Sequence, residues 1–302
     1  MSDTLAGLSR KIGGAGDLKS VVRSMKALAA ASIGQYERAV LALHDYYRTV
    51  ELGLIVCFRQ RGEAAPEPAA PANQAAKTVS AVVFGSDQGL VGQFNDSLAD
   101  FVAKALKALP GEKKVWAVGE RVASRLTDAG LTPVGVFAVP TSVSGITSLV
   151  GQILLEGESH YDKSEIDRLF LFHNSPRSGA AYEPVAQRLL PLDETWRLAL
   201  AHLPWPSGNL PEVIGGREQT LRALVREYLF VSLYKTCAES LASENASRLA
   251  AMQRAEKNID DLVADLNQTF RRLRQTSIDE ELFDVLSGYE SLSKPHPRSV
   301  EN

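Results

Sequence analysis

The feature that most constrains this chain is an uninterrupted helical pattern toward its C-terminal end, from about Arg217 to Tyr289. This stretch contains no proline, and after Gly215 and Gly216 its first glycine is Gly288. Apolar residues recur three and four positions apart throughout it, which is the periodicity of an α-helix. At 1.5 Å per residue, a helix of about 73 residues would be ~110 Å long, more than an ordinary domain can cover. The pattern therefore predicts a coiled coil or shaft that needs a partner helix.

Residues 1–58 supply the candidate partner helix. Their apolar and small residues also step by three and four, and we expect this series to face the C-terminal helix. Extra four-residue steps move the period from 3.5 toward 3.67, which predicts a gently wound pair. The series comprises Leu18, Val21, Met25, Leu28, Ser32, Tyr36, Ala39, Leu43, Tyr46, Val50, Leu54 and Cys57.

Residues 77–211 have a different pattern, because short β-branched or aromatic runs alternate with helical segments. This alternation predicts a mostly parallel sheet with right-handed crossovers. The expected strands are residues 79–84, 114–118, 134–139, 168–172 and 184–190, and the expected helices are 96–109, 121–129 and 145–160.

The expected fold class is α/β plus a long helical coiled coil. Residues 1–58 and 212–290 would form an antiparallel hairpin, with a Rossmann-like domain of about five strands inserted between them. A Pro/Ala-rich linker over 59–76 and a flexible tail over 291–302 complete the chain. The second arm is the longer one, so about Arg274–Gly288 would extend ~24 Å without a hairpin partner. Its apolar stripe predicts a contact with another molecule.

Composition excludes several function classes. The net charge of −3 gives no reason to expect nucleic acid as a partner. Cys57 and Cys237 show no metal-ligand spacing, and we expect two buried thiols that do not pair. No apolar run is long enough for a transmembrane helix, and the first residues lack the apolar core of a signal peptide. A reduced, cytoplasmic-side protein is the expectation.

The loop GSDQGLVGQFN, residues 85–95, follows the first expected strand and precedes a helix. A glycine-rich turn in this position can hold a phosphate at a helix N-terminus. Its glycine spacing is that of neither a dinucleotide fingerprint nor a phosphate loop, so we favour a tight turn in which Asn95 or Asp96 caps the next helix. The five histidines form no cluster, and His173 is interpreted as structural. Arg271, Arg272 and Arg274 form a basic turn, either a solvated face or a contact to an acidic partner.

Three stretches, in order along the chain, resemble the gamma subunit family of F-type ATP synthases. Residues 243–288 resemble its C-terminal signature, residues 86–95 its S-D-R-G-L-C-G-x-x-N segment, and residues 20–32 its K-I-T-K-A-M-x-M-V-A-A segment. The signature positions are Ser243, Glu244, Arg248, Ala251, Met252, Arg274, Gln275, Ile278, Glu281, Leu282 and Gly288. Gln88 stands where the family usually has arginine and Val91 where it has cysteine, which places the chain among divergent, bacterial-type members.

The resemblance implies a non-catalytic rotor subunit, present once per complex. Its partners would be the alpha and beta subunits, the epsilon subunit and the membrane c ring. The chain would bind no cofactor, since ATP, ADP and magnesium belong to the alpha and beta subunits. It would lie peripherally at the cytoplasmic face of the bacterial inner membrane.

The resemblance also implies two sets of functional residues. The first contacts the alpha–beta hexamer, at its moving loops or its apolar bearing, and comprises Met25, Lys26, Arg248, Gln275, Ile278, Leu282 and Val285. The second is the motif of the foot domain and comprises Ser86, Asp87, Gly89, Leu90, Gly92 and Asn95.

Two other readings stay open at this stage. A coiled-coil scaffold with an unrelated α/β domain explains the periodicity without the signature residues. A dehydrogenase-like enzyme explains only the loop at residues 85–95.

Overall fold

The computed structural model describes residues 4–59, 78–161, 168–177, 182–190 and 216–293, and six further positions at 205, 208–209, 211 and 213–214. The expected linker over 59–76 lies outside these residues except for its first position, and so does most of the expected tail. The chain divides into two compact units, one comprising residues 27–251 and the other residues 1–26 with 252–302. Helix α1 (Leu5–Arg59) and helix α6 (Arg217–Ser293) each contribute to both units.

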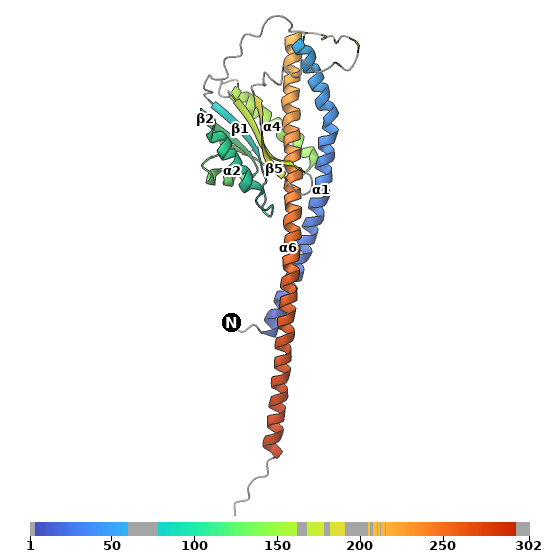
Figure 1. Cartoon of the computed structure of the whole chain (residues 1–302), viewed down its shortest axis with the longest axis vertical. Helices are drawn as coiled ribbons and strands as arrows, with labels where there is room; N and C mark the ends of the chain where they lie inside the picture. The colour runs from blue at the N-terminus through green and yellow to red at the C-terminus, as the bar shows by residue number, and fades with distance from the viewer. Residues whose placement is uncertain are drawn as a thin grey trace, which may run out of the picture. The chain divides into compact units, whose positions relative to one another are not determined.

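A five-stranded mixed sheet forms the centre of the unit that spans residues 27–251 (Figure 1). Its strand order is β3-β2-β1-β4-β5, in which β1 pairs in parallel with β2 and β4, β2 pairs in parallel with β3, and β5 is antiparallel to β4. The strands are β1 (Thr78–Phe84), β2 (Glu112–Val118), β3 (Gly135–Phe137), β4 (Arg168–Pro176) and β5 (Tyr182–Leu190).

Helices cover both faces of this sheet because its side chains alternate between two cores. On one face, Val79, Ala81 and Val83 pack against α2 (Phe94–Lys107) and α3 (Glu120–Asp128). On the other, Val82 and Phe84 pack against α4 (Val143–Tyr161) and against parts of α1 and α6. The expected inserted, Rossmann-like α/β domain is confirmed, and each expected strand and helix is present within a few residues of its predicted bounds.

In this unit α1 and α6 run antiparallel and approach closely. Tyr46 donates a hydrogen bond from its hydroxyl to Glu227, at 2.6 Å. Seven residues further along α1, a Cβ on Gly53 would lie 2.8 Å from a methyl carbon of Leu224. The partner number falls as the α1 number rises, which confirms the antiparallel pairing. Cys57 and Cys237 are both buried and form no disulfide with each other.

In the other unit the first turns of α1 pair with the second half of α6, also antiparallel. Lys19 is paired with Asp260, while Arg23 and Lys26 are both paired with Glu256. The last turns of α6, from 281 to 289, are exposed along their whole length. Among the described residues, no helix is both long enough and apolar enough to cross a membrane.

The seam of α1, meaning the series of residues expected to face α6, is wrong in its first half. Leu18, Val21 and Leu28 are 54%, 55% and 69% exposed. In this half the buried side chains recur every seven residues, at Leu8, Ala15, Val22, Ala29 and Tyr36, and further along the helix Val50, Leu54, Ile55, Val56 and Cys57 are buried. The seven-residue repeat over Leu8–Tyr36 is the pattern of a left-handed two-helix coiled coil. The prediction failed there because it counted these exposed apolar residues among those that face α6.

Candidate functional site

The loop between β1 and α2 is held together by its own polar side chains. The backbone N–H of Ser86 donates to Oδ1 of Asn95 at 3.1 Å, and Nδ2 of Asn95 donates back to Oγ of Ser86 at 2.8 Å. The Ser86 hydroxyl in turn donates to the carbonyl oxygen of Gln88 at 2.9 Å. Ser86 is fully buried and Asn95 is 3% exposed, so the hydrogen-bonded pair defines the conformation of the turn.

The predicted helix cap is wrong. The N-cap residue of α2 is Gln93, and it makes no side-chain capping hydrogen bond. Asn95 closes the loop instead, and Asp96 forms an ion pair with Arg125 at 2.9 Å. The turn has positive φ at Leu90 (63°) and Gly92 (59°), so the left-handed conformation falls partly on a leucine that is 62% exposed.

Asp87 joins this loop to two neighbouring connections at the carboxyl edge of the sheet. Its Oδ1 accepts the backbone N–H of Glu120 at 3.0 Å, and its Oδ2 accepts the backbone N–H of Val139 at 2.9 Å. These groups follow β2 and β3. A carboxylate with two N–H donors makes strong, charge-assisted bonds, so this aspartate fastens three successive strand ends together.

Helix α6 is attached to the same edge through buried hydroxyls. Ser240 donates to the carbonyl oxygen of Phe84 at 3.0 Å, and Ser247 donates to the carbonyl oxygen of Val91 at 2.5 Å. The loop is therefore bonded directly to the long helix, at points seven residues apart. Movement of this part of α6 would carry the loop with it.

His173 has the structural role that was expected of it. It lies on β4, is 3% exposed, and its Nε2 is 2.8 Å from Oε2 of Glu239 on α6. Burial raises the pKa of Glu239, but the hydrogen bond and charge of His173, together with Lys235 and Ser175, outweigh it and leave that pKa below its usual value. The pair is a further polar link between the sheet and α6.

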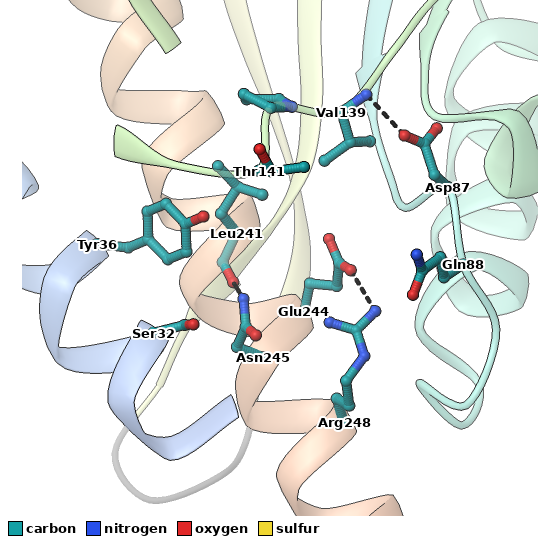
Figure 2. A pocket seen from close by; sticks show the side chains of 11 residues that line it. Ser32, Tyr36, Asp87, Gln88, Val139, Thr141, Leu241, Glu244, Asn245 and Arg248 are labelled. Atoms are coloured by element: carbon teal, nitrogen blue, oxygen red, sulfur yellow. Dashed lines mark hydrogen bonds and ion pairs between the residues drawn. The ribbon is translucent and has the colours of Figure 1, made fainter. Parts of the chain in front are cut away.

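A cleft of roughly 210 Å³ opens between the loop, α1 and α6 within this unit (Figure 2). Glu244 and Arg248 enter it from α6, and Asp87 and Gln88 face them from the loop. Nη2 of Arg248 donates to Oε1 of Glu244 at 2.5 Å. The other lining residues are Ser32, Tyr36, Val139, Pro140, Thr141, Leu241 and Asn245.

Two carboxylates, those of Asp87 and Glu244, and one guanidinium, that of Arg248, line this cleft. Burial raises the pKa of Glu244 above its usual value, although Arg248 opposes the rise, and the negative charge of Asp87 adds to it. Among the residues that line the cleft, the only cation is Arg248, and it is already paired with Glu244. The phosphate-binding interpretation of this loop therefore has no support in its geometry.

The other unit contains most of the residues expected to contact a surrounding hexamer. Glu256 bridges Arg23 at 2.8 Å and Lys26, and these two cations lower its pKa to about 2. Met25 is half-buried and Gln275 is exposed. Ile278, Leu282 and Val285 are 54%, 57% and 69% exposed, so the predicted apolar stripe is uncovered in the single chain.

Comparison with known proteins identifies the family of this chain. Residues 4–292 match the family model described as ATP synthase. The chain belongs to the ATP synthase family. Within it, the chain is 26% identical over 297 residues to the ATP synthase gamma chain of Anaeromyxobacter sp. (strain Fw109-5), covering 96% of this chain and 99% of the relative. It is 28% identical to the ATP synthase gamma chain of Hyphomonas neptunium, with the same coverage.

Solved structures of ATP synthases share the fold. The rotor of the Euglena gracilis mitochondrial ATP synthase has a TM-score of 0.62 at 16% identity, covering 91% of this chain and 98% of that one. The central stalk and c-ring structure of the Tetrahymena thermophila mitochondrial ATP synthase has a TM-score of 0.54 at 21% identity, covering 78% and 99%. The resemblance to the ATP synthase gamma family is therefore confirmed, and the unrelated scaffold is not favoured.

The structure brings only some of the predicted ATP synthase gamma residues together. Asp87 and Arg248 line one cleft, whereas Met25, Lys26 and Gln275 belong to the other unit. Sequence reasoning missed the role of Glu244 and of the hydroxyls of Ser240 and Ser247. A signal for them is present, since the segment CAESLASENAS interrupts the apolar stripe of α6 with small polar residues. Buried polar side chains need partners, so such an interruption indicates a docking surface.

Proposed function

We propose that this chain is the rotating central shaft of an F-type ATP synthase, and that it couples ion-driven rotation of the c ring to ATP synthesis or hydrolysis at the beta subunits. One observation carries the proposal: the family match extends over residues 4–292, through both long helices and the inserted α/β domain. Curated gamma chains are matched over 99% of their own length.

The unit formed by residues 1–26 and 252–302 suits a shaft that turns inside a hexamer of alpha and beta subunits. Its two helices are tied by ion pairs at Lys19, Arg23 and Lys26, which resist sliding of one helix along the other. The exposed stripe of Ile278, Leu282 and Val285 supports an apolar bearing at the end of α6. Met25, Gln275 and, in the other unit, Arg248 are proposed to meet the moving loops of the beta subunits in turn.

The unit that contains the sheet is proposed to be the foot of the rotor, where the epsilon subunit and the c ring attach. A foot that receives torque must be bonded to the shaft at several points. The hydroxyls of Ser240 and Ser247 and the pair between His173 and Glu239 supply such bonds to α6. The motif residues Ser86, Asp87 and Asn95 hold the loop that these bonds reach.

We also propose that the chain has no catalytic site and binds no cofactor of its own. ATP, ADP and magnesium would bind at the alpha and beta subunits. The cleft supports this division of labour, because the guanidinium of Arg248 is already paired with Glu244. One copy per complex would lie at the cytoplasmic face of the bacterial inner membrane, held there by its partners.

Reconstitution tests the proposal. The chain is co-expressed with the alpha and beta subunits of its own organism and the complex is purified through a tag on beta. We expect the chain to co-purify at one copy per three beta subunits, and ATP hydrolysis to depend on its presence. Purified alpha–beta hexamer that excludes the chain, or that shows the same turnover without it, contradicts the proposal.

A further inference from the structure

Helix α1 contains a cluster of glycines near its start, at Gly13, Gly14 and Gly16. They stand well inside the helix, which begins at Leu5, and all three are exposed, whereas Ala15 between them is 8% exposed. A glycine in a helix interior lowers the stability of the helix about fivefold relative to alanine, because its backbone loses more freedom on folding. The cluster therefore lowers the local stability of α1 about 100-fold.

Packing does not require these glycines. Apart from the adjacent residues and the helix's own backbone, a Cβ added to Gly13, Gly14 or Gly16 would meet no heavy atom within 4 Å. At Gly53, by contrast, a Cβ would lie 2.8 Å from a methyl carbon of Leu224, so the close approach of α6 demands glycine there. The effect of the cluster is therefore on the backbone of α1 and not on its packing.

Beyond the cluster, charged side chains fasten α1 to α6. Lys19 is paired with Asp260, and Arg23 and Lys26 are both paired with Glu256. Unwinding that starts at the glycines therefore meets these ion pairs before it can spread along α1. Toward the start of the helix, the seam consists of Leu8 and of the single methyl group of Ala15.

This first part of α1 lies opposite an apolar part of α6. The ion pairs set an antiparallel register, in which the α6 number falls by four as the α1 number rises by four. Continued toward the start of α1, the register places Leu8 opposite about position 271 and Ala15 opposite about position 264. The apolar residues of α6 in this stretch are half-buried and comprise Val263, Leu266, Phe270 and Leu273.

We propose that residues 5–16 of α1 form a detachable strap, which leaves α6 by local unfolding at the glycine cluster while the helix beyond Lys19 stays paired. Opening of the strap uncovers residues 263–273 of α6. The apolar stripe that is already exposed at Ile278, Leu282 and Val285 then becomes longer. The strap is a property of this chain alone and does not depend on the rotor function proposed above.

Hydrogen exchange of the full chain provides the first test. The triple variant Gly13→Ala, Gly14→Ala, Gly16→Ala keeps the seam, and Gly34→Ala is the matched control, since Gly34 is a helical glycine of α1 that also has room for a Cβ. We expect protection factors over residues 5–16 to rise about 100-fold in the triple variant. They should be unchanged in Gly34→Ala. Residues 5–16 that are as well protected as residues 27–50 in the unmodified chain, or an equal rise in both variants, would contradict the strap.

Thiol reactivity provides the second test, because it distinguishes detachment from unwinding in place. Ala15 and Ala29 occupy equivalent positions of the seam and are 8% and 2% exposed, and the natural cysteines are buried. We expect the Ala15→Cys thiol to react with a maleimide at least tenfold faster than the Ala29→Cys thiol, and to slow about 100-fold when the three glycines are replaced by alanine. The Ala29→Cys rate should be the same in both backgrounds. An Ala15→Cys rate that the glycine substitutions leave unchanged overturns the proposal, even where exchange of the backbone has slowed.

Discussion

Two segments of the same helix reverse the usual relation between polarity and burial. In the sheet-containing unit, α6 buries Ser240, Ser243 and Ser247, at 3%, 1% and 7% exposure. In the other unit, its last turns expose Leu282 and Val285, at 57% and 69%. The first segment is polar but meets the sheet edge of its own chain, whereas the second is apolar and contacts no other element among the residues that the structure describes. The comparison shows that side-chain character alone does not reveal whether a helix face is already occupied.

The same substitution at two leucines of α6, one in each segment, should give the largest difference in the free energy of unfolding. Leu233 is 1% exposed and belongs to the core against the sheet. We expect Leu233→Ala to lower the free energy of unfolding by about 2–5 kcal/mol, through lost burial and the cavity left behind. Leu282→Ala should change it by less than about 0.5 kcal/mol, since surface changes have small effects. Urea unfolding followed by the fluorescence of the buried Trp116 measures both, and similar losses at the two leucines would break the comparison.

Removal of the exposed end should affect assembly without affecting the fold. Deleting residues 279–302 removes Leu282, Val285 and Leu286, each of which could contribute ~1.5–3 kcal/mol if a partner buries it. We expect the affinity for the alpha–beta hexamer to fall about 100-fold or more, because each 1.4 kcal/mol is tenfold. Quantitative co-purification measures the loss, and Leu155→Ala, an exposed leucine of α4, is the matched control. Unfolding of the truncated chain, or unchanged assembly, would contradict the idea of an unoccupied face.

Like the buried serines, Asp87 connects parts of the chain through hydrogen bonds, so its substitution should lower the stability of the fold. Asp87→Ala leaves two backbone N–H groups, those of Glu120 and Val139, without their acceptor. We expect a loss of about 1.5–3 kcal/mol in the free energy of unfolding, the range for hydrogen bonds to a charged group. Gln88→Ala, one residue away on the exposed side of the loop, should change it by less than about 0.5 kcal/mol. Equal effects would indicate that the loop is not held by its aspartate.

The ion pairs of Glu256 should give the helix pair of the other unit a pH dependence in the acid range. Arg23 and Lys26 hold the pKa of Glu256 at about 2, below its ordinary value of 4.5. Because the folded state binds its proton less readily, this stabilisation is complete above pH 4.5 and is lost as the pH falls toward 2. Hydrogen exchange of residues 19–26 and 252–260 should therefore quicken over that range. In Glu256→Gln the dependence should vanish, and it should weaken in high salt.

Much of the fold could be predicted because periodicity reports which element a segment forms. The two long helices followed from a period of 3.6 and the five strands from short β-branched or aromatic runs, and β1 begins within one residue of its expected start. The seam of α1 could not be predicted, since Ala15 and Ala29 lie in it while Leu18 and Leu28 lie outside it. A leucine looks the same in sequence whether it faces a partner helix or an absent subunit.

The cleft was not predictable for a different reason. Asp87 and Arg248 are far apart in sequence, and only the docking of α6 on the sheet edge brings them to one site. Asn95 was expected to cap α2 because asparagine favours that position. A buried partner at Ser86 offered two hydrogen bonds instead of one, and the tertiary contact prevailed over the local preference.

Single-molecule rotation tests the central claim most directly. A bead is attached to the foot through Ala108→Cys, an exposed position at the end of α2, in a complex whose alpha–beta hexamer is fixed to a surface. Cys57 and Cys237 are buried and should not react. The account predicts stepwise rotation in one direction when ATP is added, which stops when ATP is removed. A complex that hydrolyses ATP at full rate while the bead stays still would contradict it.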